Sequence, residues 1–157
     1  MARIAVEIET IVDAPLAHSF DMIVPIDLSK IFTGHMGLPA VTGQKDLVGD
    51  WDEAGQTRTV LLSDNSEAQE RLLGYDRPNG FNYQVSDFTG SLRFLAKRDE
   101  GEWWFTELGN GRTKVRWEYA FIPASVIATP VITFVAKFLW RGYMKKALAN
   151  CKAFAET

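Results

Sequence analysis

The stretch FIPASVIATPVITFVAKFLW, Phe121 to Trp140, decides the fold, because it holds twenty residues with a single charge, Lys137. A membrane-spanning helix needs about 20 consecutive apolar residues. Pro123 and Pro130 interrupt this run, and proline is disfavoured inside a helix but common in its first turn. We therefore expect a strand to end at the start of the stretch and a helix, capped by Thr129, to begin at Pro130.

The expected helix runs from Pro130 to about Ala155 and meets Lys137 after only seven residues. Its apolar run is therefore too short to cross a membrane, although the bases that follow would fit the positive-inside pattern of a membrane helix. On a helical wheel, one side of its first half carries large apolar side chains. These are Val131, Phe134, Val135 and Phe138. We expect this side to cover the rest of the fold.

Length and composition indicate one domain, residues 1–157, of a soluble protein. The formal net charge of −3 argues against a general nucleic-acid binder, because such domains are usually basic. The single cysteine, Cys151, excludes an intrachain disulfide and fits a reducing compartment. The start of the chain has Glu7 and Glu9 where a signal peptide would need an apolar run. We therefore expect a cytoplasmic location.

Most of the remaining chain has the pattern of strands. RIAVEIETIV alternates apolar and polar residues, and two short helices follow in DAPLAHSFDMIVP and IDLSKIFTG. The loop HMGLPAVTGQK then leads into a region where the turn signals DNS, DRPNG, DFTG, DEG and GNG recur about every ten residues, which indicates an antiparallel meander. Helices segregated from an antiparallel sheet give an α+β fold.

Hairpin registers predict which side chains share a face. A three-residue turn at Asp64–Ser66 places Val60 opposite Glu70 and Arg58 opposite Leu72, and opposed residues point to the same face. Carrying the pairing through the later turns gives one apolar, aromatic face and one polar face. The apolar face collects Arg58, Val60, Leu62, Glu70, Leu72, Phe81, Tyr83, Val85, Phe94, Ala96, Trp103, Phe105, Val115, Trp117, Tyr119 and Phe121.

With these elements in place, the chain resembles the SRPBCC or START-like superfamily of the birch pollen allergen, polyketide cyclases and lipid-transfer domains. The likeness is carried by IVDAPLAHSFDMIV, AGQTRTVLLSDNSEAQERLLGYDRPNGFNYQV and GRTKVRWEYAFIP. It implies the helix-grip fold, in which a curved antiparallel sheet of about six to seven strands grips the long C-terminal helix around a cavity. It also implies binding or transport of hydrophobic small molecules, or cyclisation and dehydration of aromatic substrates.

We expect the cavity to be lined by inner-face residues of the sheet and the helix. Arg58 and Glu70 could anchor a ligand carboxylate or carbonyl, or could form a purely structural ion pair. The candidate lining residues are Arg58, Val60, Glu70, Leu72, Tyr83, Phe94, Trp103, Phe105, Trp117, Tyr119, Val131, Phe134, Val135 and Phe138. His35 and Asp87 could lie at the mouth, although a solvated loop histidine and a turn-capping aspartate are the ordinary alternatives.

The expected function is binding of a hydrophobic or amphipathic small molecule of lipid, polyketide or aromatic type. One alternative is a cyclase- or dehydratase-like enzyme that uses Glu70 or Tyr83 with Arg58. Another is a membrane-surface lipid-transfer module, because residues 119–155 contain five basic residues and no Asp or Glu. Two histidines and one cysteine make a metal site improbable, and no phosphate or dinucleotide motif is present, so we expect no cofactor. The ligand and the oligomeric state stay open.

Overall fold

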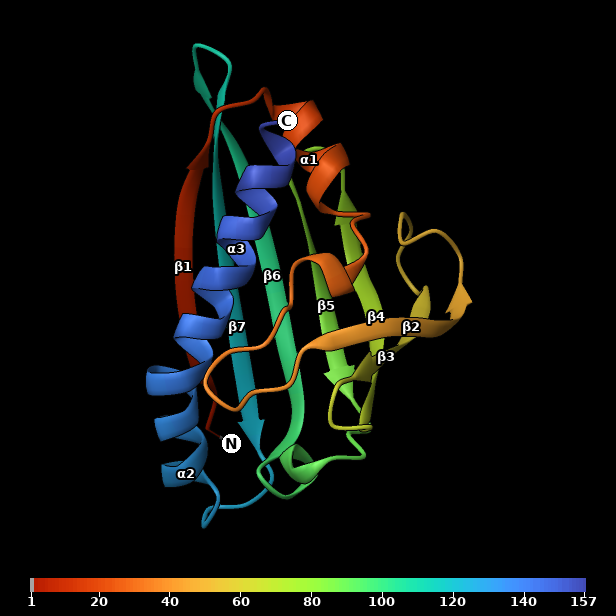
Figure 1. Ribbon diagram of the computed structural model, residues 1–157, viewed down its shortest axis with the longest axis vertical. Coiled ribbons are helices and arrows are strands. Elements are labelled where there is room, and N and C mark those ends of the chain that lie inside the picture. The colour runs from red at the N-terminus through yellow and green to blue at the C-terminus, as the bar shows by residue number, and fades with distance from the viewer. Residues whose placement is uncertain (1) are drawn as a thin grey trace.

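Seven antiparallel strands form one sheet in the order β1-β7-β6-β5-β4-β3-β2 in the computed structural model, which describes residues 2–157 (Figure 1). The strands are β1 (Ile4–Val12), β2 (Val41–Val48), β3 (Thr57–Leu62), β4 (Glu67–Asp76), β5 (Gly80–Ser86), β6 (Ala96–Gly109) and β7 (Arg112–Pro123). The short helices are α1 (Leu16–Ile23), η1 (Leu28–Lys30) and η2 (Ser91–Phe94). A long C-terminal helix follows as α2 (Thr129–Phe134), η3 (Val135–Trp140) and α3 (Arg141–Ala155). The expected α+β helix-grip architecture is confirmed.

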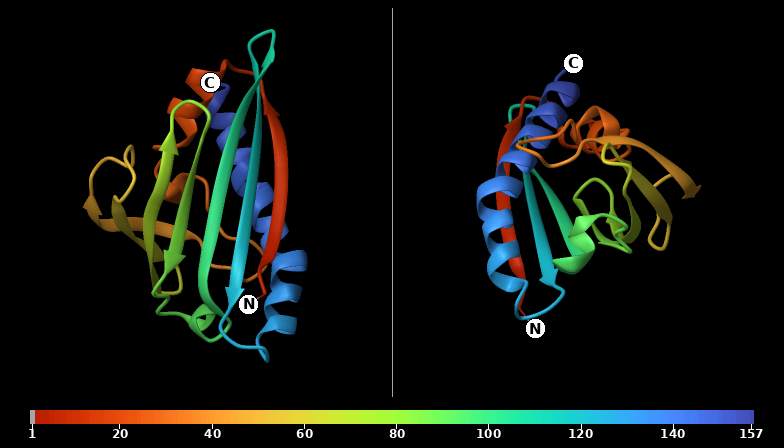
Figure 2. Two further views of the ribbon diagram at one scale, coloured as in Figure 1. Left: turned by 180° about the vertical axis from the view of Figure 1, so that it is seen from behind. Right: turned by 60° about the horizontal axis from the view of Figure 1, so that its bottom comes forward.

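The C-terminal helix lies across one face of the curved sheet, and α3 packs beside β1 (Figures 1 and 2). Its buried side is built from Ile132, Ala136, Met144, Leu148 and Cys151. The helix begins at Thr129, one residue earlier than expected, and its first turn is not capped by the Thr129 side chain. Within residues 2–157 no helix is both long and apolar enough to cross a membrane.

The side of the C-terminal helix that faces the sheet differs from the expectation. Val131, Phe134 and Phe138 are 50%, 55% and 64% exposed, whereas Ile132 and Ala136 are fully buried. The first half of this helix carries apolar side chains on more than one side, so hydrophobicity alone does not select the side that packs. The side that packs is therefore set by tertiary contacts, which bury Ile132 and Ala136 and place Val135 and Trp140 at the cavity. The prediction was wrong for Val131, Phe134 and Phe138, whereas Val135 does line the cavity.

The hairpin between β3 and β4 has a register two residues away from the expected one. Arg58 pairs with Glu70, and Val60 pairs with Ala68. The turn lies one residue earlier than expected, because the Asp64 carboxylate accepts a hydrogen bond of 2.9 Å from the Ser66 backbone N–H. A shift of two residues keeps every side chain on its face, whereas a shift of one would have exchanged the faces.

Strand β6 continues through the DEG sequence, where a turn was expected. Gly101 stays in the strand, and the Tyr83 ring packs over it so closely that a Cβ there would lie 2.2 Å from Tyr83 Cζ. As a result, Asp99 lies on the same inner face as Trp103. At the start of this region Phe94 belongs to η2, not to a strand, and its side chain is 65% exposed. The expected loop HMGLPAVTGQK also contains the start of β2.

Candidate functional site

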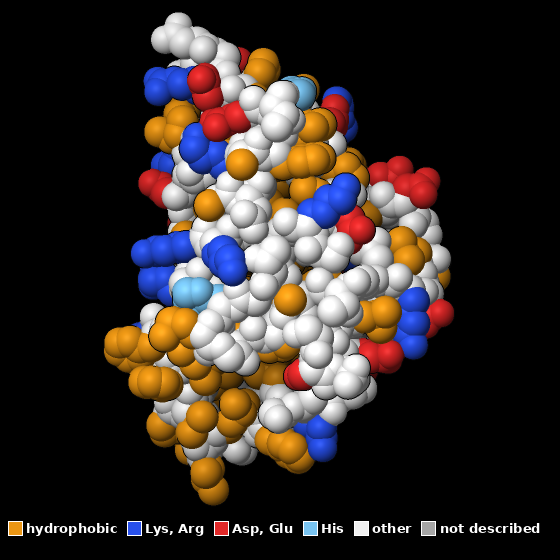
Figure 3. Space-filling view, viewed as in Figure 1, with side chains coloured by type: hydrophobic (Ala, Val, Ile, Leu, Met, Phe, Trp, Pro, Cys, Tyr) orange, Lys and Arg blue, Asp and Glu red, His pale blue; other side chains and the backbone are white. Residues whose placement is uncertain are grey.

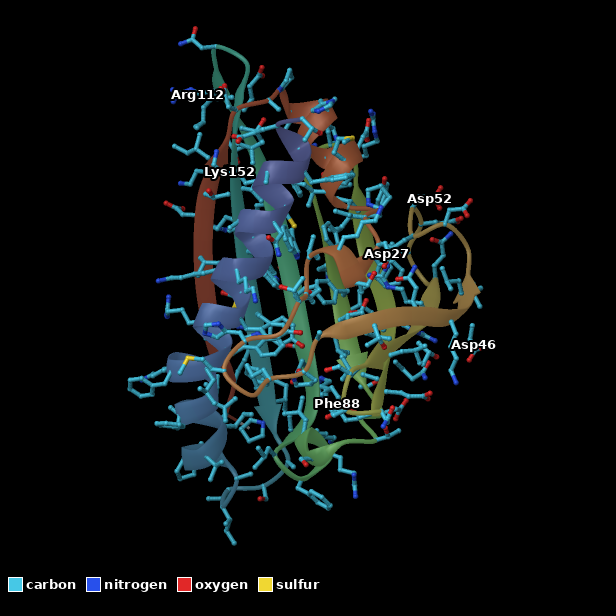
Figure 4. The ribbon with its side chains drawn as sticks, in the orientation of Figure 1. Asp27, Asp46, Asp52, Phe88, Arg112 and Lys152 are labelled. Atoms are coloured by element: carbon cyan, nitrogen blue, oxygen red, sulfur yellow. The ribbon has the colours of Figure 1, made fainter. Side chains whose placement is uncertain are left out.

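A cavity of about 370 Å³ lies between the inner face of the sheet, the C-terminal helix and the segments that follow α1 and β5. Its apolar wall includes side chains from almost every element of the fold. Among them are Ile23, Leu28, Ile31, Phe32, Leu38, Val41, Trp51, Val60, Ala68, Phe81, Val85, Phe88, Leu92, Leu95 and Phe121. Figure 4 shows Phe88 near the lower end of the sheet, by the loop that follows β5. A mostly apolar hollow with a few polar groups is typical of a small-molecule site.

The structure brings half of the predicted lining residues to the cavity wall. These are Arg58, Val60, Glu70, Tyr83, Trp103, Tyr119 and Val135. Three others, Leu72, Phe105 and Trp117, are buried on the same face of the sheet but pack behind the wall. The remaining four were wrongly placed, because their side chains are exposed outside the cavity. These are Phe94, Val131, Phe134 and Phe138.

The two predicted mouth residues also lie outside the cavity wall. His35 packs against the C-terminal helix, where a Cβ on Gly142 would lie only 2.3 Å from His35 Nε2. Asp87 is exposed in the loop after β5, with φ of 54°. The rim near Asp87 is formed instead by Phe88 and Gly90, which do line the cavity.

Arg58 and Glu70 form an ion pair on the cavity wall. Arg58 Nε and Nη2 lie 2.9 Å and 2.8 Å from Glu70 Oε1. The Arg58 guanidinium also stacks over the Trp51 ring, 3.8 Å from its centroid. The prediction that both side chains point inward within salt-bridge reach is confirmed. Stacking and pairing together hold the guanidinium in one orientation toward the cavity.

A second polar pair, Asp99 and Tyr119, was missed by the sequence reasoning. The Tyr119 hydroxyl donates a hydrogen bond of 2.7 Å to Asp99 Oδ2, and Asp99 is fully buried. Burial raises the pKa of Asp99 well above its ordinary value, because a desolvated carboxylate is unfavourable, and the Tyr119 hydrogen bond offsets only part of this. If the DEG sequence had been interpreted as strand, the two-residue alternation of side chains would have placed Asp99 on the same inner face as Trp103.

Aromatic side chains surround these polar groups. Trp140 stacks on Tyr143 with centroids 4.6 Å apart and lies 4.8 Å from the Tyr119 ring. The Tyr83 hydroxyl accepts a hydrogen bond of 3.3 Å from Trp117 Nε1, and burial raises the pKa of Tyr83. The cavity therefore offers flat apolar surfaces with hydroxyl, carboxyl and indole groups set among them.

Among residues 2–157, no three His, Cys, Asp or Glu side chains are grouped closely enough to hold a metal ion.

The comparisons with known proteins agree with this architecture. Residues 3–156 match the family model described as polyketide cyclase, dehydrase and lipid transport. A Thalictrum flavum norcoclaurine synthase point mutant, solved in complex with a transition state analogue, is similar with a TM-score of 0.69 and 11% identity, covering 98% of this chain and 94% of that one. Major latex-like protein 151 of Panax ginseng is similar with a TM-score of 0.67 and 13% identity, covering 96% of each chain.

A bacterial protein of Nitrosospira multiformis is similar with a TM-score of 0.62 and 19% identity, covering 95% of this chain and 94% of that one. At such identities the likeness shows a shared fold. No curated protein matches the sequence.

Proposed function

The chain belongs to the polyketide cyclase, dehydrase and lipid transport family, and we propose that it binds one hydrophobic or amphipathic small molecule between the sheet and the C-terminal helix. The observation that carries this proposal is the cavity of about 370 Å³ with its mostly apolar wall. Pockets of about 300–1,000 Å³ accommodate small organic ligands. The polar groups on the wall are few and held in place, so they would orient a ligand that the apolar wall retains.

Native mass spectrometry of protein purified without detergent tests this proposal. We expect a non-covalent adduct of a few hundred daltons that disappears under denaturing conditions. The adduct should also be extractable into organic solvent, which allows its chemical class to be determined. Extracts identical to a blank, together with failure to take up any added apolar compound, would contradict the proposal.

A membrane-surface lipid carrier is a second candidate, favoured by an exposed apolar patch. We call this patch the apolar end. It consists of Phe94, Val126, Ile127, Val131, Phe134 and Phe138. Figure 3 shows hydrophobic side chains gathered at the lower end of the molecule, over α2 and the loop before it. Val126 and Ile127 are each 88% exposed, and clustered exposed apolar side chains commonly mark an interaction surface.

Basic side chains border the apolar end. Arg93 lies over the Phe94 ring, 4.3 Å from its centroid, and Lys137 and Arg141 follow on the C-terminal helix. Residues 119–155 contain no acid. Apolar side chains beside bases suit the surface of an anionic bilayer. Val135, which lines the cavity, belongs to the same part of the helix, so docking there would bring a lipid close to the cavity.

Vesicle co-sedimentation tests the membrane candidate. We expect binding to phosphatidylcholine vesicles that contain phosphatidylserine, weaker binding to phosphatidylcholine alone, and loss of binding in the double variant Phe134→Asp with Phe138→Asp. Leu47→Asp is the matched control, because Leu47 is a similarly exposed apolar residue on β2. Equal sedimentation of the double variant and the control would exclude the apolar end as a membrane surface.

A further inference from the structure

Among the described carboxyl groups of the cavity wall, only that of Asp99 is fully buried, and only one of its two oxygens is hydrogen-bonded. Its Oδ2 accepts the hydrogen bond from Tyr119, while its Oδ1 has no hydrogen-bond partner within residues 2–157. Its neighbours on the adjacent strands are Val85 on β5 and Phe121 on β7, both apolar. A buried polar atom without a partner is costly and calls for an explanation.

The charge state of Asp99 follows from its surroundings. The cation of the cavity, Arg58, is held by Glu70, and the strand neighbours supply no positive charge. Burial without a cation beside it raises the pKa of Asp99 well above its ordinary value, which favours the protonated carboxyl. Since Oδ2 accepts from Tyr119, the proton resides on Oδ1, which then acts as a donor.

A second donor without a partner belongs to Trp140, whose ring packs beside Tyr119. Trp140 Nε1 is buried and has no partner among the described residues, and an indole N–H can only donate. The Trp140 ring lies 4.8 Å from the Tyr119 ring, and both Trp140 and Asp99 line the cavity. Two unsatisfied donors on one wall match a ligand group that accepts hydrogen bonds without donating any.

We propose that Asp99 and Trp140 form a subsite for a carbonyl oxygen of the ligand, with Tyr119 holding Asp99 in place. This proposal rests on the proposed ligand binding and names its chemical class: an apolar or aromatic ketone, ester or quinone. A carbonyl oxygen accepts two hydrogen bonds through its two lone pairs. A hydrocarbon of the same shape would leave both buried donors unpaired, which lowers its affinity.

Two matched probes test this subsite by quenching of tryptophan fluorescence. They are 2-acetylnaphthalene and 2-isopropylnaphthalene, which have similar shapes but differ in the carbonyl. At pH 6 we expect the wild-type protein to bind the ketone about tenfold more tightly, since one or two hydrogen bonds distinguish the probes. Trp140→Phe should reduce this preference severalfold, and Asp99→Leu should nearly abolish it.

Asp99→Asn is the informative conservative variant. Its amide oxygen can accept from Tyr119 and its amide N–H₂ can donate to the ligand, so it should keep the preference for the ketone. As the pH rises through the pKa of Asp99, wild type should lose the preference while Asp99→Asn keeps it. The other titratable groups that line the cavity are Asp64, Glu67, Tyr83, Tyr119, Tyr143 and the Arg58–Glu70 pair. They are the same in both proteins, so the comparison isolates Asp99.

Asp46→Asn provides the control for the same chemical change at an exposed site on β2 (Figure 4), and it should bind like wild type. Equal affinities of wild type for the two probes, with both bound, would overturn the carbonyl subsite and leave cavity binding intact. An undiminished ketone preference in Asp99→Leu would do the same. If Asp99→Leu does not fold, the pH series with Asp99→Asn decides. Failure of both probes to bind would overturn the proposed function together with this inference.

Discussion

The Tyr119 hydroxyl donates a 2.7 Å hydrogen bond to Asp99 Oδ2 inside the cavity. The two residues come from neighbouring strands, β7 and β6, and both are buried. Removal of a carboxyl from water favours its protonated form, and the hydrogen bond from the neutral Tyr119 hydroxyl offsets only part of this preference. This pair therefore couples the stability of the fold to pH, which can be measured without knowledge of the ligand.

Asp99→Asn should alter the pH dependence of stability. Because burial raises the pKa of Asp99, the folded chain keeps a proton that the unfolded chain releases above about pH 4. The free energy of unfolding of wild type should therefore fall as the pH rises from about 4 toward the folded pKa, with a contribution from this group of up to about 1.4 kcal/mol per pH unit. Asp99→Asn lacks this contribution.

Thermal melts between pH 4 and 7 check this prediction. The Tm of Asp99→Asn relative to wild type should increase with pH, and the exposed control Asp46→Asn should show no such trend. A difference between Asp99→Asn and wild type that stays constant over this range would mean that Asp99 is ionised in the folded chain.

Removing one partner of the Arg58–Glu70 pair should cost more than removing both. Arg58→Ala leaves Glu70 without its cation at a site where its side chain is only 12% exposed. Breaking a buried pair in this way typically costs about 3–5 kcal/mol, whereas the double variant carries no unpaired charge. Urea denaturation of Arg58→Ala, Glu70→Ala and the double variant gives the comparison. Additive losses in the double variant would show that the two side chains do not depend on each other.

Gly101→Ala should disturb the cavity through Tyr83. A Cβ at Gly101 would lie 2.2 Å from Tyr83 Cζ, so the ring must move, and we expect a loss of roughly 1–3 kcal/mol in the free energy of unfolding. Gly43→Ala is the matched control, because it lies in β2 with its nearest contact at 3.8 Å. Chemical denaturation that shows the same small change for both variants would contradict the close packing of Tyr83.

The inner and outer sides of the C-terminal helix should respond differently to substitution. Ile132 is fully buried, so Ile132→Ala should cost about 2–5 kcal/mol. Phe134 is mostly exposed, so Phe134→Asp should change stability by only about 0.5 kcal/mol. Unfolding curves for the two variants test the orientation directly. The opposite ranking would place Phe134 against the sheet and Ile132 outside.

Sequence patterns were sufficient for the order of the elements and for the inner face of most strands. Alternation of apolar and polar residues in β3, β4, β5 and β7 indicates the inner face of each strand. The observed register, in which Arg58 pairs with Glu70, differs from the expected one by two residues and therefore leaves the faces unchanged. The boundaries were less accurate, since Thr129 rather than Pro130 begins the helix. Such boundaries depend on backbone contacts that a single sequence does not display.

The candidate site was only half predictable because two features depend on tertiary contacts. Gly101 resembles a turn residue in the sequence, yet it lies in β6 because the Tyr83 ring needs the space above it. Asp99 was therefore overlooked. The inward side of the C-terminal helix, where Ile132 and Ala136 are buried, is likewise set by tertiary packing. Neither fact is encoded in hydrophobic periodicity.

Binding of N-phenyl-1-naphthylamine, an apolar fluorescent probe, tests the central claim of a ligand cavity most directly. Titration should show saturable binding with one site per chain. Ala68→Phe should abolish this binding, because Ala68 lines the cavity and the larger side chain would fill it. Ala153→Phe, on the exposed side of α3, should bind like wild type. Absence of saturable binding in wild type, or unchanged binding in a folded Ala68→Phe variant, would contradict the claim.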